Sequence, residues 1–234
     1  DVAVNLGVGV PEYVASVANE EGIGDFMTLT VEGGAVGGVP AGGIRFGSAY
    51  NADALIDQGY QFDFYDGGGL DLCYLGLAEC DGHGNINVSR FGPRIAGCGG
   101  FINITQNTPK VFFCGTFTAG GLKVKVEDGK VVIVQEGKQK KFLKDVEQVT
   151  FNGDIALKNK QQVMYLTERC VFHLQEDGMH LTEIAPGIDL QTQILDMMDF
   201  EPIIDRDENG EIKLMDARLF TDGLMGLKEM KEGC

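Results

Sequence analysis

The fold class of the chain follows from VAVNLGVGVPEYVASVANEEGIGDFMTLTVE, residues 2–32. The opening apolar run, 2–10, ends among glycines and is typical of a buried strand. Pro11 suits the first turn of a helix, which we expect over 12–20. Apolar and β-branched residues predict a second strand over 26–31. A strand–helix–strand unit is typical of a parallel sheet, so we expect an α/β protein.

The downstream sequence predicts further elements of both kinds. We expect helices over 52–58, with Asn51 as its N-cap, 189–198 and 216–230. We expect strands over 62–65, 86–88 and 111–116, while 70–77 fits a strand or a helix. Asp128-Gly129 and Asp177-Gly178 each separate two strand-like runs, which is a hairpin signal: 122–127 with 130–137, and 170–174 with 179–183.

These patterns together predict a mostly parallel open sheet with flanking helices, glycine-rich loops at strand ends and additional antiparallel hairpins. The composition changes near residue 122, where the glycine-rich segments end. We expect one domain over 1–234, with an active-site core in 1–121 and hairpins and C-terminal helices in 122–234.

Composition limits the classes of partner. The net charge is −16, and acids flank the one dense group of lysines at 138–144, so we expect no nucleic-acid binding. No apolar run is long enough to predict a membrane span. Because the chain begins at Asp1 in a strand pattern, we expect it to be a piece of a longer protein.

The cysteines form no C-x-x-C pair and lie mostly among apolar residues: Cys73, Cys80, Cys98, Cys114, Cys170 and Cys234. This arrangement predicts reduced core cysteines in a cytoplasmic protein, with no metal site.

A glycine-rich stretch, TLTVEGGAVGGVPAGGIRFG at 28–47, contains one acid, Glu32, followed by seven glycines. Glycine leaves the backbone bare, so a ligand can approach it closely. Glu32 lies where the strand predicted over 26–31 ends, at the mouth of an α/β sheet. A second glycine cluster, 97–100, could supply backbone amides to an oxyanion. These features favour nucleophilic attack by Glu32 on an acyl group, with a simple turn residue as the alternative.

Three other patterns give weaker candidates. In GVGVPE at 7–12, Glu12 stands where a dinucleotide site needs glycine, and its carboxylate would repel pyrophosphate. Asp205 to Asp216 has EF-hand spacing but lacks the usual final Glu, so a solvated turn competes with a cation site. His83 lies in a glycine turn near Glu79 and is either a surface residue or a catalytic one.

Several segments together resemble the C-terminal (β) half of the family I CoA-transferases. VEGGAVGGVPAGG at 31–43 is similar to the family's glutamate-glycine motif, and NLGVGVPEYVA at 5–15 to the strand–turn–helix that opens this half. GNINVSRFGPRIAGCGGFINI at 84–104 is similar to the downstream glycine-rich segment. The likeness covers essentially the whole chain and is greatest to the propionate (lactate or acetate) CoA-transferases of fermenting anaerobes.

The resemblance implies a site. The motif glutamate maps to Glu32, which would be the nucleophile. The second cluster maps to Gly99 and Gly100, and Gly100 would donate an amide to the thioester carbonyl. Further residues map to the pocket lining: Gly33, Gly34 and Glu79. The close relatives usually have E-S-G where this chain has Glu32-Gly33-Gly34.

The resemblance also implies a reaction. CoA would pass between short-chain acids such as propionate, acetate and lactate, carried covalently on Glu32 in ping-pong fashion, with no metal and no tightly bound cofactor. Two other functions remain open: an acyl-CoA hydrolase on the same scaffold, and a non-catalytic domain that binds ligands of the sugar-phosphate type.

Partners follow from the same likeness. The close relatives carry two similar halves that pack together, and the N-terminal (α) half is absent from this sequence. We therefore expect the chain to need that half and to form an oligomer of two-half units. The nearest candidates for the CoA phosphates, none of them assigned, are Arg45, Arg90 and Arg94.

Overall fold

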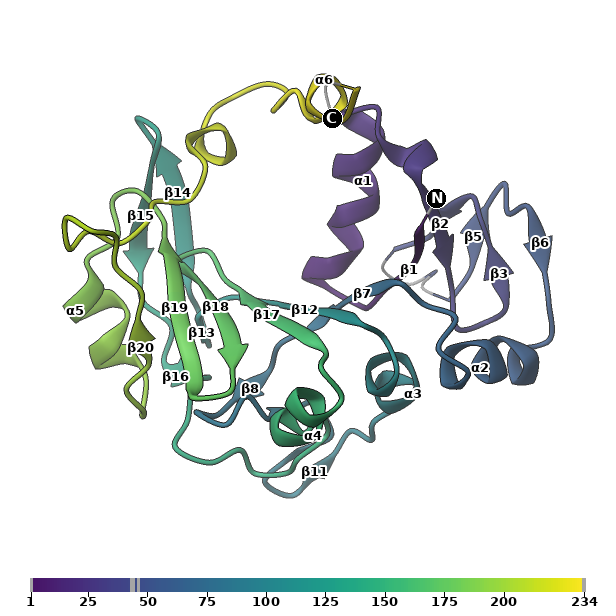
Figure 1. Ribbon diagram of the computed structural model, residues 1–234, viewed down its shortest axis with the longest axis horizontal. Coiled ribbons are helices and arrows are strands. Elements are labelled where there is room, and N and C mark those ends of the chain that lie inside the picture. The colour runs from purple at the N-terminus through teal and green to yellow at the C-terminus, as the bar shows by residue number, and fades with distance from the viewer. Residues whose placement is uncertain (1, 43–44, 46, 233–234) are drawn as a thin grey trace. The chain divides into compact units, whose positions relative to one another are not determined.

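The computed structural model describes residues 2–42, 45 and 47–232 (Figure 1). Asp1, Gly43 of the glycine-rich stretch and Cys234 lie outside the described residues. The chain divides into two compact units that alternate along the sequence. Unit 1 comprises Asp1–Gly76, Cys98–Phe112 and Leu224–Cys234, and unit 2 comprises Leu77–Gly97 and Phe113–Gly223.

The sheet of unit 1 contains β1 (Val2–Leu6), β2 (Met27–Thr30), β3 (Ala35–Val36), β6 (Ala54–Leu55), β7 (Leu72–Gly76) and β12 (Lys110–Cys114), whose last two residues belong to unit 2. The strand order is β12-β7-β1-β2-β3-β6. β1 is parallel to both β2 and β7, whereas β3 pairs antiparallel with β2 and β6. A separate antiparallel ribbon joins β4 (Val39–Pro40) and β5 (Ala49–Tyr50).

The helices of unit 1 are α1 (Tyr13–Glu20), α2 (Gln58–Asp66), α3 (Phe101–Gln106) and α6 (Leu227–Glu232), with short 3-10 helices η1 (Val10–Glu12) and η2 (Gly24–Phe26). Ala15 of α1 packs with Val4, Leu6 and Leu29 in the core of the unit. α2 and α3 lie side by side, where Asn103 donates to the carboxylate of Asp66 at 3.0 Å.

Unit 2 is built around an antiparallel meander of β17 (Gln162–Leu166), β18 (Cys170–Gln175) and β19 (Gly178–Ile184), with β20 (Ile203–Ile204) parallel to β19. Four small hairpins or ribbons surround it: β8 (Glu79–Cys80) with β9 (Ile86–Asn87), β10 (Arg90–Phe91) with β11 (Arg94–Ile95), β13 (Thr118–Ala119) with β16 (Gln139–Lys140), and β14 (Lys123–Glu127) with β15 (Lys130–Gln135). Its helices are α4 (Gly153–Lys158), α5 (Leu190–Gln193), η4 (Leu195–Met197) and η5 (Ala217–Phe220).

Aromatic rings and the buried guanidinium of Arg169 form the centre of the core of unit 2. Phe117 stacks on Phe142 with 4.6 Å between ring centroids. The fully buried guanidinium of Arg169 lies 5.0 Å from the Phe117 ring and pairs with Glu136 at 2.6 Å and Glu168 at 2.9 Å. Two carboxylates and a ring face therefore compensate the desolvation of this guanidinium.

The α/β class is confirmed, as are its antiparallel hairpins. Asp128 and Gly129 have φ of 51° and 72° between β14 and β15, as a tight two-residue turn requires. The run 70–77 forms β7, which settles its ambiguity. None of the helices in the described residues combines the length and apolarity that a membrane span needs. The single domain over 1–234 stays a prediction.

The expected helix over 52–58 and the expected strand over 62–65 are wrong. Asn51 has φ of 53° and follows β5, and Asp57 is the residue that caps a helix, accepting from the amide of Gly59 at 3.2 Å. The aromatic run 62–65 lies inside that helix, α2, because Gln61 and Tyr65 bury one helical face.

The helices expected near the C-terminus are shorter than predicted. The helix expected over 189–198 begins at its N-cap, Asp189, but is interrupted at Ile194 and forms two short helices, α5 and η4. The helix expected over 216–230 is interrupted by Gly223 and Gly226, whose φ values are 100° and 72°. The structure has η5 and α6 in its place. Left-handed glycines end helices because other residues rarely adopt that conformation.

Cysteines behave mostly as core residues, as expected. Cys98 is exposed at the second glycine cluster, and the other described cysteines are buried: Cys73, Cys80, Cys114 and Cys170.

Candidate functional site

Glu32 lies in a tight turn directly after β2. The amide of Gly34 donates to the carbonyl of Val31 (2.9 Å), and the amide of Val31 donates to the carbonyl of Ala35 (2.9 Å). The chain reverses here so that β3 can pair antiparallel with β2. The turn places Glu32 at the carboxyl end of β2, the edge at which parallel sheets carry their reactive groups.

The glycines after Glu32 allow two stretches of backbone to meet. A Cβ at Gly33 would lie 2.5 Å from the carbonyl oxygen of Gly47, and one at Gly34 would lie 2.0 Å from that of Ile56. Gly34 also has φ of 104°, a conformation that favours glycine. Packing of the chain on its own backbone therefore explains why glycine is needed at these two positions.

The structure brings Glu32 together with the second glycine cluster inside unit 1. A Cβ at Gly100 would lie 2.7 Å from Oε2 of Glu32 and 2.9 Å from Cζ of Phe62. Gly100 is the N-cap of α3, and Phe62 is carried by α2. The carboxylate and the aromatic ring thus both cover the bare Cα of Gly100.

Backbone amides of this cluster are available beside the carboxylate. Among the described residues, neither Gly99 nor Gly100 donates its amide to a backbone or side-chain acceptor. Gly99 has φ of 52°, and a Cβ there would meet no atom within 4 Å. Open N–H donors next to an acid can stabilise the oxyanion that forms when the acid attacks a carbonyl carbon.

The Glu32 carboxylate is partly desolvated. Its side chain is partly buried, and this burial raises the pKa of Glu32 above its ordinary value. Within the described part of the chain, the carboxylate accepts no hydrogen bond and forms no ion pair. A carboxylate with few hydrogen bonds keeps its lone pairs available for attack.

Four buried polar side chains form a cluster at the end of β2: Asn5, Thr30, Gln61 and Tyr65. The Tyr65 hydroxyl accepts from Nε2 of Gln61 (2.8 Å) and Nδ2 of Asn5 (3.1 Å). It donates to Oγ1 of Thr30 (3.2 Å). Tyr65 also interacts electrostatically with Glu32, which helps to raise the pKa of Tyr65, although burial is the larger cause.

Sequence reasoning missed this cluster. Its signal is the pair Gln61 and Tyr65, which are four residues apart and share one face of a helix. The expectation of a strand over 62–65 hid that signal, because a strand separates the two side chains along its length.

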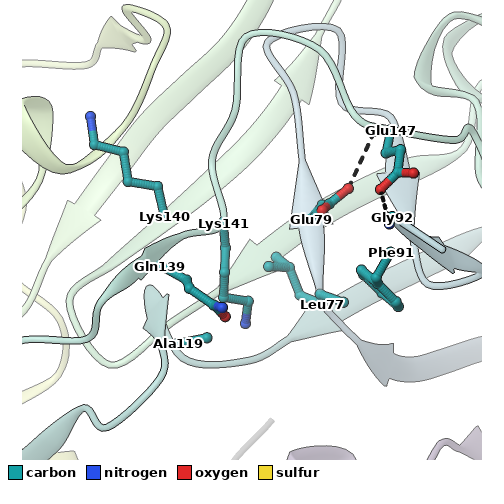
Figure 2. Close-up of a pocket in the computed structure, with 10 residues that line it drawn as sticks. Leu77, Glu79, Phe91, Gly92, Ala119, Gln139, Lys140, Lys141 and Glu147 are labelled. Atoms are coloured by element: carbon teal, nitrogen blue, oxygen red, sulfur yellow. Dashed lines mark hydrogen bonds between the residues drawn. The ribbon is translucent and has the colours of Figure 1, made fainter. Parts of the chain in front are cut away.

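Glu79 belongs to unit 2 and lines a cavity of about 600 Å³ there (Figure 2). Its Oε2 accepts from Nδ2 of Asn87 (2.7 Å) and from the amide of Glu147 (3.2 Å). Lys141 lines the same cavity, and its Nζ donates to the carbonyl of Thr116 at 2.7 Å. Burial lowers the pKa of Lys141 to about 8.

The weaker candidates have structural roles. Oε1 of Glu12 accepts from the amide of Gly9 at 2.8 Å, so this acid caps the turn that leads into α1. His83 lies in the turn between β8 and β9, where its amide donates to Asp81 at 3.0 Å.

Two of the three candidate arginines already have partners. Arg45 donates to the hydroxyl of Tyr50 at 2.9 Å, and Arg90 lies 3.5 Å from the carboxylate of Glu147. Arg94 lies in the exposed strand β11.

The acids of the EF-hand-like segment, 205–216, have hydrogen-bond or ion-pair partners within the protein. Asp205 bonds Nδ1 of His180 at 2.7 Å, and Asp207 accepts from the amide of Glu211 at 2.9 Å. Asp216 pairs with Arg218. No group of three or more potential metal ligands occurs among the residues that the structure describes. These contacts favour the interpretation of the segment as a turn.

The chain is 54% identical over 222 residues to acetate CoA-transferase YdiF of Escherichia coli (strain K12), and 54% identical over 229 residues to caffeate CoA-transferase of Acetobacterium woodii. The alignments cover 95% and 96% of this chain but only 41% and 43% of the relatives. The chain therefore spans about two fifths of the length of these relatives.

A shorter relative matches along most of its own length. Acetate CoA-transferase subunit beta of E. coli (strain K12) is 30% identical over 201 residues, which are 81% of each chain. The crystal structure of acyl-CoA transferase YdiF from E. coli O157:H7, in a thioester complex with CoA, superposes with a TM-score of 0.89. It is 52% identical over 96% of this chain and 42% of that one. No protein-family model matches the chain.

Proposed function

Because the chain belongs to the family I CoA-transferases, as a β-type half, we propose that it supplies the nucleophile that moves CoA between an acyl-CoA and a carboxylic acid. The observation that carries the proposal is the partly desolvated Glu32 carboxylate, without hydrogen-bond partners among the described residues, against Gly100. The CoA thioester named for the YdiF crystal structure supports a covalent route.

In the first half-reaction, an oxygen of Glu32 attacks the thioester carbonyl carbon of the acyl-CoA. The carbonyl π electrons move to oxygen, and amides of Gly99 and Gly100 stabilise the negative charge. The intermediate collapses, the C–S bond breaks, and CoA leaves as a thiolate. Glu32 is then joined to the acyl group as a mixed anhydride, without any net proton transfer.

The thiolate then attacks the Glu32 carbonyl carbon of the anhydride. The C–O bond to the acyl group breaks, the first carboxylate leaves, and Glu32 carries CoA as a thioester. An incoming carboxylate reverses these steps and leaves as a new acyl-CoA. The cycle requires that water be kept from the Glu32 thioester, and the Phe62 ring beside the carboxylate is suited to that task.

We assign short-chain acids such as acetate, propionate and lactate as the substrate class. YdiF is named for acetate and the A. woodii enzyme for caffeate, and both are 54% identical to this chain. The choice of acid therefore depends on individual pocket residues, because one methylene is worth only about 1–3 kcal/mol in an apolar pocket.

The experiment is a trap of the intermediate on the assembled two-half enzyme. Incubation with acetyl-CoA or propionyl-CoA, followed by borohydride or hydroxylamine, should modify Glu32, and peptide mass spectrometry locates the change. Glu32→Gln should abolish the trapped product, because an amide does not form the anhydride. Glu20→Gln, on the exposed end of α1, is the matched control and should behave as the wild type.

Product analysis separates transfer from hydrolysis. Without an acceptor, a transferase releases about one equivalent of the first acid per active site and keeps CoA on Glu32, so free CoA should not accumulate. Release of CoA at the same rate without an acceptor would show a hydrolase, and an unmodified Glu32 would contradict the covalent route altogether.

A further inference from the structure

The hydroxyl of Tyr65 is fully used within the buried cluster. It accepts two N–H bonds, from the side chains of Asn5 and Gln61, and it donates its own proton to Thr30. The Thr30 hydroxyl in turn donates to the carbonyl of Val4 at 3.1 Å. Nδ2 of Asn5 also donates to the carbonyl of Thr30 at 3.3 Å. Each of these donors therefore has its acceptor within the cluster or on the neighbouring backbone, and none of them donates to Glu32.

The amide oxygens of the cluster show what holds it in this arrangement. Oδ1 of Asn5 and Oε1 of Gln61 are buried and accept no hydrogen bond among the described residues. A buried acceptor without a donor costs free energy. Nε2 of Gln61 nevertheless stays on Tyr65, which is the acceptor that sets its orientation, whereas the Asn5 amide is held by both Tyr65 and the carbonyl of Thr30.

Glu32 is the neighbour for which this orientation matters. It interacts electrostatically with Tyr65, and Phe62, on the same helix as Tyr65, adjoins its carboxylate at Gly100. Hydrogen bonds to a carboxylate stabilise its charge and make it a weaker base. The Gln61 amide, once released from Tyr65, would have Glu32 as an acceptor that lacks partners.

We propose that Tyr65 is a positioning residue that holds the side-chain amide of Gln61 away from Glu32, so that the carboxylate stays a poorly hydrogen-bonded nucleophile. This inference rests on the proposed role of Glu32. It goes beyond that role by assigning a task to a buried group that does not contact the substrate.

The test is the pH dependence of Glu32 thioester formation in the assembled enzyme with acetyl-CoA. In Tyr65→Phe, Gln61 loses its acceptor while Asn5 keeps the carbonyl of Thr30, and we expect the apparent pKa of the rate profile to fall by about one unit. The maximal rate should fall about tenfold or more, with the KM for acetyl-CoA within about twofold of the wild type.

Tyr165→Phe is the matched control. Tyr165 is also fully buried, and its hydroxyl donates one hydrogen bond, to the carbonyl of Gly84 at 2.6 Å in unit 2. This variant should lose stability as any buried Tyr→Phe does, but its rate profile should keep the wild-type midpoint. A change in midpoint therefore separates positioning from general destabilisation.

A double variant keeps the inference testable if Tyr65→Phe folds poorly. Gln61→Leu removes one amide at similar volume, so Tyr65→Phe/Gln61→Leu should recover part of the lost rate and move the midpoint back up. An unchanged midpoint in Tyr65→Phe, or no recovery in the double variant, would overturn the inference. A wild type that forms no Glu32 thioester would instead refute the proposed function.

Discussion

Gly100 makes room for the Glu32 carboxylate. Its φ of −80° is ordinary for any residue, so glycine is not needed there for the backbone. It is needed because a side chain would occupy the space that Oε2 of Glu32 and the ring of Phe62 now fill. Substitution at this position therefore perturbs the carboxylate more than it perturbs the fold.

Gly100→Ala should slow Glu32 thioester formation by about 100-fold, because its Cβ would displace the carboxylate by a distance that costs that much in rate. The free energy of unfolding should change by less than about 2 kcal/mol, since Glu32 can rotate away. Gly59→Ala on α2 is the control, because its Cβ would meet nothing closer than Asp57 at 3.9 Å. Equal rates in the two variants would contradict the prediction.

Lys141 gives stability a defined pH dependence. Burial lowers its pKa to about 8, while an unfolded chain has a lysine pKa near 10.4. Below pH 8 the Lys141 amine is protonated in both the folded and the unfolded state, and the buried charge destabilises the folded state. Between the folded-state and the unfolded-state pKa, Lys141 is protonated only in the unfolded state. The free energy of unfolding should therefore rise with pH in this range, by up to about 1.4 kcal/mol per pH unit.

Urea unfolding across that pH range measures the slope. In Lys141→Met the rise should disappear, whereas Lys140→Met should keep it, because Lys140 lies nearer the surface and pairs with Asp199 at 2.8 Å. A wild type and a Lys141→Met variant with parallel pH profiles would show that the buried amine does not titrate in this range.

The part of the candidate site that lies in one sequence motif, Glu32 and its glycines, was predictable from sequence. Glu32 stood alone among glycines at a strand end, and the structure brings it to Gly100 as the two glycine clusters suggested. Tyr65 was not predictable, since its role depends on contacts with β1 and β2 that local sequence does not encode. The reason inferred for the glycines was incomplete, because Gly34 serves close packing of the chain on itself.

At the level of elements, the turn after β2 depends on the absence of side chains. Gly34 combines a φ of 104° with a carbonyl oxygen, that of Ile56, where its Cβ would be. Either feature alone can be tolerated at a modest cost, but the two together leave no relaxed position for an added methyl group.

Gly34→Ala should lower the free energy of unfolding by more than about 3 kcal/mol, as large core disruptions do. Gly129→Ala is the matched control, because Gly129 has φ of 72° but open space around its Cβ, and it should cost about 1–2 kcal/mol. Thermal or urea unfolding of both variants gives the comparison. Similar losses would mean that backbone conformation alone, and not the contact with Ile56, makes glycine necessary.

Helix and strand assignments failed where tertiary contacts outweighed local pattern. The segment 52–58 contains good helix formers, yet β6 within it pairs with β3 because the glycine-rich turn brings them together. The segment 62–65 is aromatic and favours a strand locally, but the cap at Asp57 and the buried face of α2 make it helical.

At the scale of the whole molecule, unit 1 holds Glu32, Gly99, Gly100 and the Tyr65 cluster. The chain has a net charge of −16, although CoA carries phosphates. We propose that cations for those phosphates come largely from outside this chain, since the alignments cover only 41% and 43% of the longer relatives. We therefore place the missing cationic groups on a companion half.

The chain alone should form no detectable Glu32 thioester with acetyl-CoA, and addition of the N-terminal half should restore it. Mass spectrometry of the trapped intermediate measures both states, and Glu32→Gln with the companion half present is the blank. Equal labelling of the isolated chain would show that this half carries a complete site.

The exposed Cys98 thiol offers a labelling site for a probe of the turnover cycle. It lies two residues before Gly100, and the other described cysteines are buried. A thiol-reactive fluorophore would therefore attach selectively among the described cysteines, two residues from the glycine that adjoins the carboxylate. Its emission would report, in real time and without radiolabel, how long the covalent intermediate persists before the next acid arrives.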